Sequence, residues 1–382
     1  MKLMPSNLDY RSLAVKGVQK LHPYQPGKPI EELERELGVK DIIKLASNEN
    51  PLGSSPKAKA AMQAALNDLE LYPDGSGYQL KLAIAGKFDL LPQQITLGNG
   101  SNDLLEIVAR AYLTPGRAAV FSQYAFAIYA LVSQSAGADL LTAEAFPPEH
   151  VTMPYGHNVD ALLKTIKDNP HTALVFISNP NNPTGTWIAR EELYRFLKNV
   201  PPHVVVLLDE AYTEYVQDPA FPNGMLWLNE FPNLIVTRTF SKIYGLAGLR
   251  VGYSISSPEI ADILNRVRQP FNVNSLALTA ASAALEDDAF LQASVTTNEA
   301  GLKQWYAACA AHGWSYIPTV GNFITVKVEG KTGAQVYEAL LREGVIVRPI
   351  GGYGLPQHLR ITVGTEAQNT RCIKALDKVL KA

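Results

Sequence analysis

The sequence predicts an α/β fold in which helices cover a mostly parallel central sheet, with a smaller α+β domain towards the C-terminus. In the centre of the chain, short apolar runs alternate with longer amphipathic segments, as expected for parallel strands joined by helices. After about residue 276 the pattern changes to a long helical stretch followed by short strand-like runs. A chain of 382 residues with 47% hydrophobic residues suits about two packed domains.

Local signals predict the individual elements. Residues 54–69 predict a helix with Ser55 as N-cap and Pro56 at the first helical position, because proline has a fixed φ and lacks a donor. An amphipathic helix is expected at 190–200 and a long helical stretch at 275–313. Strands are expected at 118–122, 172–178, 204–208 and 233–237, and in the C-terminal part at 323–328, 344–350 and 358–363.

These elements divide the chain into three segments. We expect residues 1–50 to form an N-terminal arm and part of the small domain, 51–275 the large domain, and 276–382 the small C-terminal domain. The sequence contains no repeat, low-complexity tract or long linker, so we expect the domains to pack together with a cleft between them.

Charge and composition exclude several classes of function. With 34 Lys and Arg against 36 Asp and Glu, the net charge of -2 favours neither a nucleic acid nor a membrane partner. The N-terminus lacks the apolar core of a signal peptide, and no segment reaches the roughly 20 apolar residues that span a bilayer. Cys309 and Cys372 form no CxxC, and no HExxH occurs. We therefore expect a cytoplasmic protein with reduced cysteines and no metal site.

Polar clusters follow three of the expected central strands. The run "NPNNPTG" (179–185) follows the strand at 172–178, Asp209 follows the strand at 204–208, and Ser241 and Lys242 follow "NLIVTRTF". The carboxyl ends of parallel strands form the edge of a sheet at which ligands bind. We therefore expect these clusters to converge on one site.

Each cluster also has an ordinary explanation. A lone lysine after a strand is usually a solvated loop residue, and Asp209 has the residue type of a helix N-cap. The run "NPNNPTG" is typical of a tight turn, and Arg250 suits a surface ion pair of little energetic value. These explanations account poorly for the occurrence of all four features in one chain.

One ligand would use all of these groups: an aromatic aldehyde with a phosphate and a ring nitrogen. A lysine amine forms a Schiff base with an aldehyde, and an aspartate beside a pyridine nitrogen keeps that nitrogen protonated. In "ITLGNGSNDLLEI" an apolar strand runs into Gly98, Gly100 and Ser101 and then into an amphipathic helix, whose N-terminus suits an anion. This combination indicates pyridoxal 5'-phosphate (PLP).

The motifs carry a family resemblance. The runs "NPNNPTG", "LDEAY" and "TFSKIYGLAGLRVGY", in this order, resemble the fold-type I PLP-dependent aminotransferases. Within that fold, "LHPYQPGKPIEELERELG", "KLASNENPLG", "LYPDGSGYQLKLAIA", "GNGSNDLLEI" and "LRITVG" resemble the histidinol-phosphate aminotransferase family over almost the whole chain. The resemblance implies a PLP enzyme of histidine biosynthesis, which exchanges an amino group between L-histidinol phosphate and glutamate or 2-oxoglutarate by a ping-pong mechanism.

The resemblance also implies roles for the strand-end residues. Lys242 would form the Schiff base and move the proton between the substrate's α-carbon and the cofactor, and Asp209 would pair with the ring nitrogen. Asn182 and Tyr212 would hydrogen-bond the 3'-oxygen of the ring. Phe126 of "YAFAIY" would stack on the ring, with Tyr124 as the alternative.

The cofactor's phosphate would be held by residues from both subunits of a homodimer with shared active sites. Tyr72 would reach the phosphate from the neighbouring subunit. The remaining contacts would come from two segments, the glycine turn "GNGSN" (98–102) and the lysine motif "TFSKIYGLAGLR" (239–250). The residues are Gly100, Ser101, Asn102, Ser241 and Arg250.

Substrate recognition is expected to involve the small domain. In "HLRITV" the apolar residues alternate with Arg360 and Thr362, so a period of two puts Arg360 on the face opposite the core. Arg348 lies in a similar strand-like run, where it is either a second anion-binding group or a charge at the rim. The resemblance adds Tyr24 and Asn50 to the substrate-binding residues.

Three rival functions remain open. Two belong to the same fold: an aromatic amino-acid aminotransferase and a decarboxylase of a phosphorylated amino acid such as threonine phosphate. The third is a regulatory or scaffold protein that binds the cofactor without catalysis. The sequence fills every catalytic position of the family pattern, which argues against the third.

Overall fold

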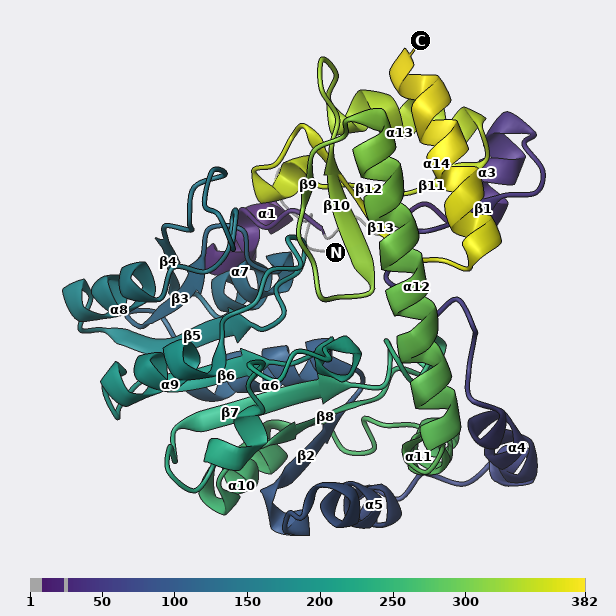
Figure 1. Ribbon diagram of the computed structural model, residues 1–382. Coiled ribbons are helices and arrows are strands. Elements are labelled where there is room, and N and C mark those ends of the chain that lie inside the picture. Colours follow the sequence, from purple (N-terminus) through teal and green to yellow (C-terminus); the bar gives the residue numbers. More distant parts are fainter. Residues whose placement is uncertain (1–8, 24–26, 382) are drawn as a thin grey trace, which may run out of the picture.

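In the computed structural model, which describes residues 9–23 and 27–381, seven strands of the described chain form the central sheet (Figure 1). Their order is β2-β8-β7-β6-β5-β3-β4. The bounds are β2 Ile95–Gly98, β3 Ala118–Ser122, β4 Asp139–Ala143, β5 Thr172–Ser178, β6 Val205–Asp209, β7 Leu234–Thr239 and β8 Gly252–Ile255. Strand β8 is antiparallel to both neighbours, and the other pairs are parallel. The predicted, mostly parallel α/β sheet is confirmed.

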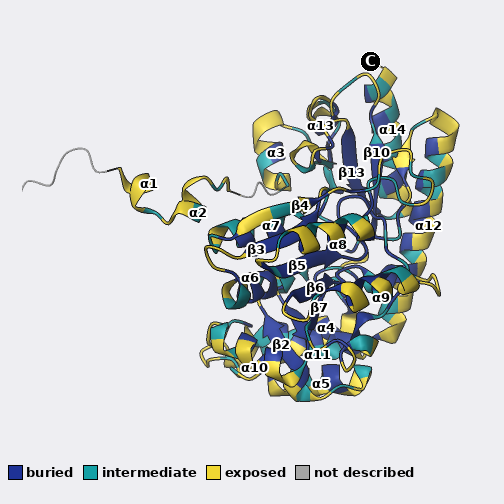
Figure 2. Ribbon diagram, turned by 90° about the vertical axis from the view of Figure 1, so that its left-hand side faces the viewer, coloured by how far each residue is buried: buried dark blue, intermediate teal, exposed yellow. Residues whose placement is uncertain are grey.

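Helices cover both faces of this sheet, because every second side chain of a strand faces the same way. In β6, Leu207 packs into the cluster that includes α6 (Ser101–Tyr112), α7 (Ala127–Ser135) and α10 (Pro258–Val267). Its neighbour Leu208 packs into the cluster that includes α5 (Tyr78–Phe88), α8 (Val159–Asp168) and α9 (Arg190–Asn199). The sheet is therefore buried between two helical layers (Figure 2).

A smaller antiparallel sheet in the described residues has the order β12-β13-β10-β9. Its strands are β9 Tyr316–Ile317, β10 Phe323–Lys327, β12 Arg348–Pro349 and β13 His358–Thr362. It shares a hydrophobic core with α13 (Gly333–Arg342) and α14 (Glu366–Lys381). Leu359 and Ile361 enter this core, whereas Arg360 between them lines a cavity, as the predicted alternation requires.

The N-terminal part of the described chain contains α1 (Tyr10–Leu13), α2 (Lys16–Gln19) and α3 (Ile30–Leu37). Helix α2 contacts α7 beside the large sheet, and the chain joins the small sheet region after α3. Strand β1 (Ile43–Lys44) then pairs in parallel with β11 (Val345–Ile346). This pairing leads residues 45–50 past both sheets.

The helical stretch expected at 275–313 is divided into α11 (Ser275–Leu285) and α12 (Asp288–His312). Asp287 ends the continuity, because its side chain accepts a hydrogen bond from the backbone N–H of Phe290 at 3.3 Å and caps α12. Helix α12 runs alongside both sheet regions (Figure 1). It contributes Val295 to the core of the large sheet and Trp305 to that of the small one. The domain limits expected at 50/51 and 275/276 stay predictions.

Helix α4 (Pro56–Ala64) begins at the expected residues and ends earlier than expected, in a 3-10 turn at Ala65–Asp68. Ser55 is the N-cap, and its Oγ accepts from the N–H of Ala58 at 3.3 Å. The same hydroxyl donates to Oδ2 of Asp287 at 2.5 Å, and both residues are buried. One serine thus ties the start of α4 to the start of α12.

Ser55→Ala should lower the free energy of unfolding by about 1–3 kcal/mol, because it removes a helix cap and a hydrogen bond to a buried carboxylate. Urea denaturation followed by circular dichroism measures the change. Ser135→Ala, on the exposed side of α7, is the control and should change stability by less than about 0.5 kcal/mol. Equal effects of the two substitutions would contradict the coupling between α4 and α12.

Candidate active site

A cavity of about 200 Å³ lies at the edge where β5, β6 and β7 end, with Ser178, Asp209 and Thr239 in its wall. Most of the residues expected from the sequence line it: Ser101, Asn102, Phe126, Asn182, Asp209, Tyr212, Ser241, Lys242, Arg250, Arg348 and Arg360. Of the two aromatic alternatives, Phe126 lines the cavity. Tyr124 is not among the described residues of its wall and packs edge-on against Tyr155, at 5.3 Å between ring centroids.

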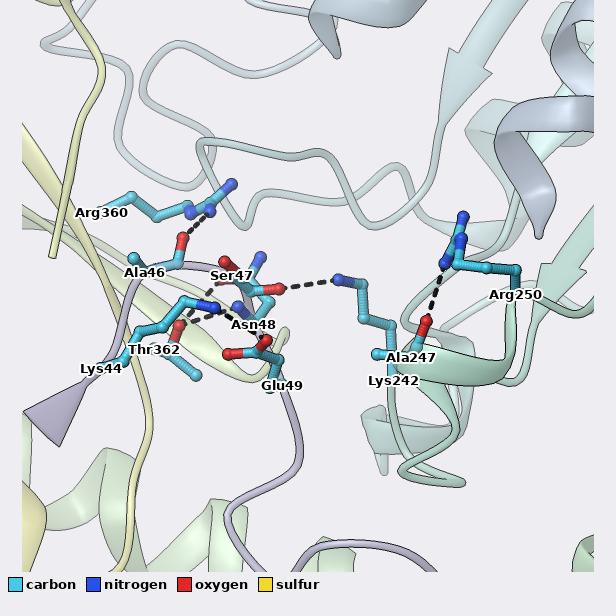
Figure 3. A network of polar contacts seen from close by, with 10 residues as sticks. All are labelled: Lys44, Ala46, Ser47, Asn48, Glu49, Lys242, Ala247, Arg250, Arg360 and Thr362. Atoms are coloured by element: carbon cyan, nitrogen blue, oxygen red, sulfur yellow. Dashed lines mark hydrogen bonds and ion pairs between the residues drawn. The ribbon is translucent and has the colours of Figure 1, made fainter. Parts of the chain in front are cut away.

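Lys242 extends into the cavity instead of into solvent. Its Nζ donates a hydrogen bond to the carbonyl oxygen of Ser47 at 3.0 Å (Figure 3). Burial of the ammonium group lowers the pKa of Lys242 to about 7, and the nearby guanidinium of Arg360 acts in the same direction. A large fraction of the amine is therefore neutral and nucleophilic near neutral pH.

Asp209 provides a buried carboxylate, only 4% exposed, at the end of β6. Its Oδ2 accepts from the hydroxyl of Tyr129 at 2.9 Å, and its Oδ1 accepts from the hydroxyl of Thr237 at 3.1 Å. Burial raises the pKa of Asp209 to about 6, while both hydroxyl donors oppose the rise. Asp209 does not cap the following 3-10 turn, whose N-cap position is Tyr212.

Asn182 and Tyr212 are each held by a polar partner. Nη1 of Arg360 donates to Oδ1 of Asn182 at 2.6 Å, and its Nη2 donates to the carbonyl oxygen of Ala46 at 2.6 Å. The amide N–H groups of Asn182 are thereby left to face a ligand. The hydroxyl of Tyr212 accepts from Nδ2 of Asn48 at 2.9 Å, and burial raises its pKa to about 12.

The start of α6 and the lysine motif form a cradle for an anion. Gly100 has a φ of 80°, and a Cβ there would lie 2.3 Å from Nη2 of Arg250, so only glycine allows this approach. Nη1 of Arg250 donates to Oγ of Ser241 at 3.2 Å. Ser101 and Asn102 begin the helix at the cavity wall, so its positive end faces the cavity.

Arg348 and Arg360 form a cross-strand pair. They lie directly opposite each other in the register of β12 and β13, and both line the cavity. Like charges at directly opposed positions of two strands repel each other, so a bound anion beside them would be stabilising. The Nε of Arg360 is buried without a hydrogen-bond partner among the described residues, which leaves a donor for such an anion.

Two of the expected side chains, those of Asn50 and Tyr72, lie away from the described cavity wall. Nδ2 of Asn50 donates to the carbonyl oxygen of Ile243 at 2.7 Å and to Oγ of Ser294 at 2.9 Å, which favours support of the Lys242 loop over contact with substrate. Tyr72 is 84% exposed and stacks on Phe271 at 4.9 Å. Neither belongs to the described residues of the cavity wall. Tyr24 lies outside the described residues.

Sequence reasoning missed Ser47, Asn48 and Tyr129, which contact Lys242, Tyr212 and Asp209 respectively. Ser47 acts through a backbone carbonyl, so no residue type reveals it. Asn48 has a φ of 56°, a conformation that asparagine adopts more readily than most residues. Tyr129 lies three residues after Phe126, the N-cap of α7, a spacing that brings the two rings into contact at the start of the helix.

The described parts of the chain bear on two other classes of site. Across residues 9–23 and 27–381, no helix has the length and apolar character needed to cross a membrane. The same residues bring together no group of three or more His, Cys, Asp or Glu side chains suited to a metal ion.

Comparison with known proteins identifies the family. The family model "Aminotransferase class I and II" matches residues 40–376. The chain is 56% identical to histidinol-phosphate aminotransferase 2 of Methylococcus capsulatus, covering 97% of this chain and 98% of the relative. It is 53% identical to histidinol-phosphate aminotransferase 1 of Nitrosococcus oceani, covering 99% of each.

Comparison with a solved structure supports the same family. The fold matches the crystal structure of histidinol-phosphate aminotransferase from Sinorhizobium meliloti in complex with pyridoxal-5'-phosphate, with a TM-score of 0.85 and 27% identity. The match covers 96% of this chain and 97% of the other. The resemblance predicted from the motifs and the fold-type I architecture are thereby confirmed. The chain belongs to the class I and II aminotransferases and, within them, to the histidinol-phosphate aminotransferase family.

Proposed function

We propose that this chain is a PLP-dependent transaminase that transfers the amino group of L-histidinol phosphate to 2-oxoglutarate, yielding imidazole acetol phosphate and glutamate. One observation carries the proposal: a single cavity holds a lysine amine, an anion cradle, a buried carboxylate and a pair of opposed arginines. The curated relatives, at 53–56% identity, support histidinol phosphate as the donor.

The residues present fit PLP. The closeness of Gly100 to Arg250 and the start of α6 suit its phosphate, and the carboxylate of Asp209 suits its ring nitrogen. Lys242 lines the same cavity as both. When bound, PLP accepts the electron pair that is released when a bond at the substrate's α-carbon breaks.

Lys242 and Asp209 would perform the proton chemistry. With a pKa of about 7, Nζ of Lys242 is available as a nucleophile towards an aldehyde and as a base towards the proton on the substrate's α-carbon. The carboxylate of Asp209, with a pKa of about 6, is mostly ionised at neutral pH and would hold a proton on the ring nitrogen.

Other residues would bind and orient the ring. The amide of Asn182 and the hydroxyl of Tyr212 would hydrogen-bond its 3'-oxygen, since Arg360 and Asn48 hold these groups in place. Phe126 would pack against the face of the ring, because it is the aromatic residue of the two candidates that lines the cavity.

Arg348 and Arg360 would bind the substrate's anionic group. Histidinol phosphate has no α-carboxylate, so its phosphate must supply the negative charge, and the two opposed guanidinium groups suit it. Glutamate would place a carboxylate against Arg360 in the other half-reaction. Tyr24 would add a further contact to the substrate.

We propose that the protein works as a homodimer in which Tyr72 reaches the partner's anion cradle. Exposed apolar residues support a contact surface: Phe271, on which Tyr72 stacks, and the residues near Tyr72 in the sequence, Leu66, Leu69, Leu71, Tyr78 and Leu82. Sedimentation of the purified protein measures its state of assembly. Because the relatives are enzymes of histidine biosynthesis, we also propose a cytoplasmic location.

Assay of the purified protein with histidinol phosphate, phenylalanine, tyrosine and threonine phosphate, each with and without 2-oxoglutarate, tests the proposed activity. Histidinol phosphate should give the highest kcat/KM, and turnover should require 2-oxoglutarate. A preference for phenylalanine or tyrosine would identify an aromatic aminotransferase, and release of carbon dioxide from threonine phosphate would identify a decarboxylase. Retention of PLP without turnover of any donor would identify a non-catalytic binding protein.

Lys242→Ala should abolish turnover and the borohydride-reducible link between protein and PLP, while the phosphate contacts still bind PLP noncovalently. In the wild-type protein, the rate of link formation should rise with pH through about 7, because only the neutral amine attacks the aldehyde. Borohydride reduction at timed intervals, followed by peptide mapping, locates the link and measures how fast it forms. Lys198→Ala, at an exposed position of α9, is the control. A reducible adduct on another lysine would refute the assignment.

Asp209→Asn should leave PLP bound and reduce turnover on the order of 10²-fold or more, because a neutral amide cannot stabilise a protonated ring nitrogen. Steady-state kinetics and the absorbance of bound PLP measure the two effects. Asp262→Asn, at an exposed position of α10, should leave both unchanged. Near-normal turnover of Asp209→Asn would show that the carboxylate has only a structural role.

Arg348→Ala should damage the histidinol phosphate half-reaction more than the glutamate half-reaction, whereas Arg360→Ala should damage both. Loss of one charge-assisted contact costs about 1.5–3 kcal/mol, or about 10- to 150-fold in kcat/KM. Single-turnover kinetics of each half-reaction measure the effects, with dephosphorylated histidinol as the control substrate. A wild-type protein that handles histidinol as well as its phosphate would contradict recognition of the phosphate.

A further inference from the structure

Tyr129 of α7 contacts Asp209, whose carboxylate we propose pairs with the cofactor's ring nitrogen, from outside the cavity. Its side chain is completely buried, and its hydroxyl donates to Oδ2 of Asp209 at 2.9 Å. Tyr129 does not belong to the described residues of the cavity wall, so it has no direct contact with a ligand there. The hydroxyl of Tyr129 can act on the chemistry through the carboxylate of Asp209.

The position of the Tyr129 hydroxyl is fixed by the packing of its ring. The ring stacks on Phe176 of β5, with centroids 4.8 Å apart and planes 10° apart. On another side it meets Phe126 edge-on, at 5.7 Å and 86°. Phe126 occupies the N-cap position of α7 and accepts a backbone hydrogen bond from Tyr129 at 3.1 Å. The helix start, the strand and the aromatic contacts thus aim the hydroxyl at the carboxylate.

The two oxygens of Asp209 are held from different elements. Tyr129 of α7 donates to Oδ2, and Thr237 of β7 donates to Oδ1 at 3.1 Å. Two donors on the two oxygens set the orientation of the carboxylate plane. They also reduce its affinity for a proton, because hydrogen bonds to the charged form of a carboxylate favour that form. A carboxylate with lower proton affinity leaves a shared proton on its partner.

We propose that Tyr129 is a positioning residue of the transamination reaction, and that its hydroxyl holds the Asp209 carboxylate in the orientation and charge state needed to pair with a protonated ring nitrogen. The inference rests on the proposed function. It predicts that the hydroxyl matters for chemistry although it touches neither cofactor nor substrate. A tyrosine with only a packing role would tolerate phenylalanine at this position.

Tyr129→Phe removes the hydroxyl and keeps the ring contacts. Tyr112→Phe is the matched control, because Tyr112 packs against the same hydrophobic cluster and its buried hydroxyl has no hydrogen-bond partner among the described residues. Fluorescence quenching of the apo protein measures the dissociation constant for PLP. Steady-state kinetics with histidinol phosphate and 2-oxoglutarate measure kcat and KM. Thermal unfolding of each apo variant reports whether it is folded.

For Tyr129→Phe we expect about a tenfold or larger rise in the dissociation constant for PLP and a fall in kcat on the order of 10-fold to 100-fold. KM for both substrates should change less than about threefold, because Tyr129 does not touch them. Tyr112→Phe should match the wild type. In an Asp209→Asn background the added effect of Tyr129→Phe should shrink to less than about twofold, because the two residues act through one hydrogen bond.

Three outcomes would overturn the inference while wild-type turnover remains intact. These are an unchanged Tyr129→Phe variant, equal losses in Tyr129→Phe and Tyr112→Phe, and an undiminished effect of Tyr129→Phe in the Asp209→Asn background. A wild-type apo protein that binds no PLP would instead overturn the proposed function, and this inference with it. The two failures are therefore distinguishable in one set of measurements.

Discussion

The common direction of β5, β6 and β7 is the constraint on which the site depends. Because these strands are parallel, their carboxyl ends place Asn182, Asp209 and Lys242 around one cavity although the chain separates them widely. Strand β8 runs the other way, so its beginning lies at the same edge and delivers Arg250 just before Gly252. A reversal of any of these strands would move its polar residues to the opposite edge of the sheet.

The positively charged side chains at this edge repel one another in the absence of a ligand, and the same charges favour the binding of anions. The cavity wall described here contains three guanidinium groups, those of Arg250, Arg348 and Arg360, and the carboxylate of Asp209, beside the partly protonated amine of Lys242. The excess of positive charge helps to lower the pKa of Lys242, with Arg360 as the largest electrostatic contributor after burial. Anions relieve this repulsion when they bind, so a phosphate-bearing cofactor and a phosphate-bearing substrate fit the same electrostatic arrangement.

The segment at residues 45–50 joins the two sheet regions across the cavity. Its carbonyl oxygens accept from Arg360 of the small sheet and from Lys242 of the large one, at Ala46 and Ser47 respectively. Asn48 bonds Tyr212 by its side chain and accepts, through its carbonyl oxygen, from Nδ2 of Asn322 at 2.9 Å. The orientation of the catalytic groups therefore depends on a segment that contributes mainly backbone atoms, and any substitution that shifts it would disturb several of them together.

The sequence by itself determined the α/β fold, the strands that carry polar residues at their ends, and the main cavity residues, because apolar periodicity and turn signals act over a few residues. It also determined the outward face of Arg360, from alternation along one strand. Only the tertiary structure decided that the helical stretch at 275–313 breaks before α12, where Asp287 meets Ser55, and that Asn50 supports the Lys242 loop. The tertiary structure alone also decided the partners of Lys242 and Asp209. Ser47 lies 195 residues from Lys242 and acts through a carbonyl oxygen, which every residue has. Tyr129 lies 80 residues from Asp209. Contacts over such separations depend on how whole elements pack, which no local pattern encodes.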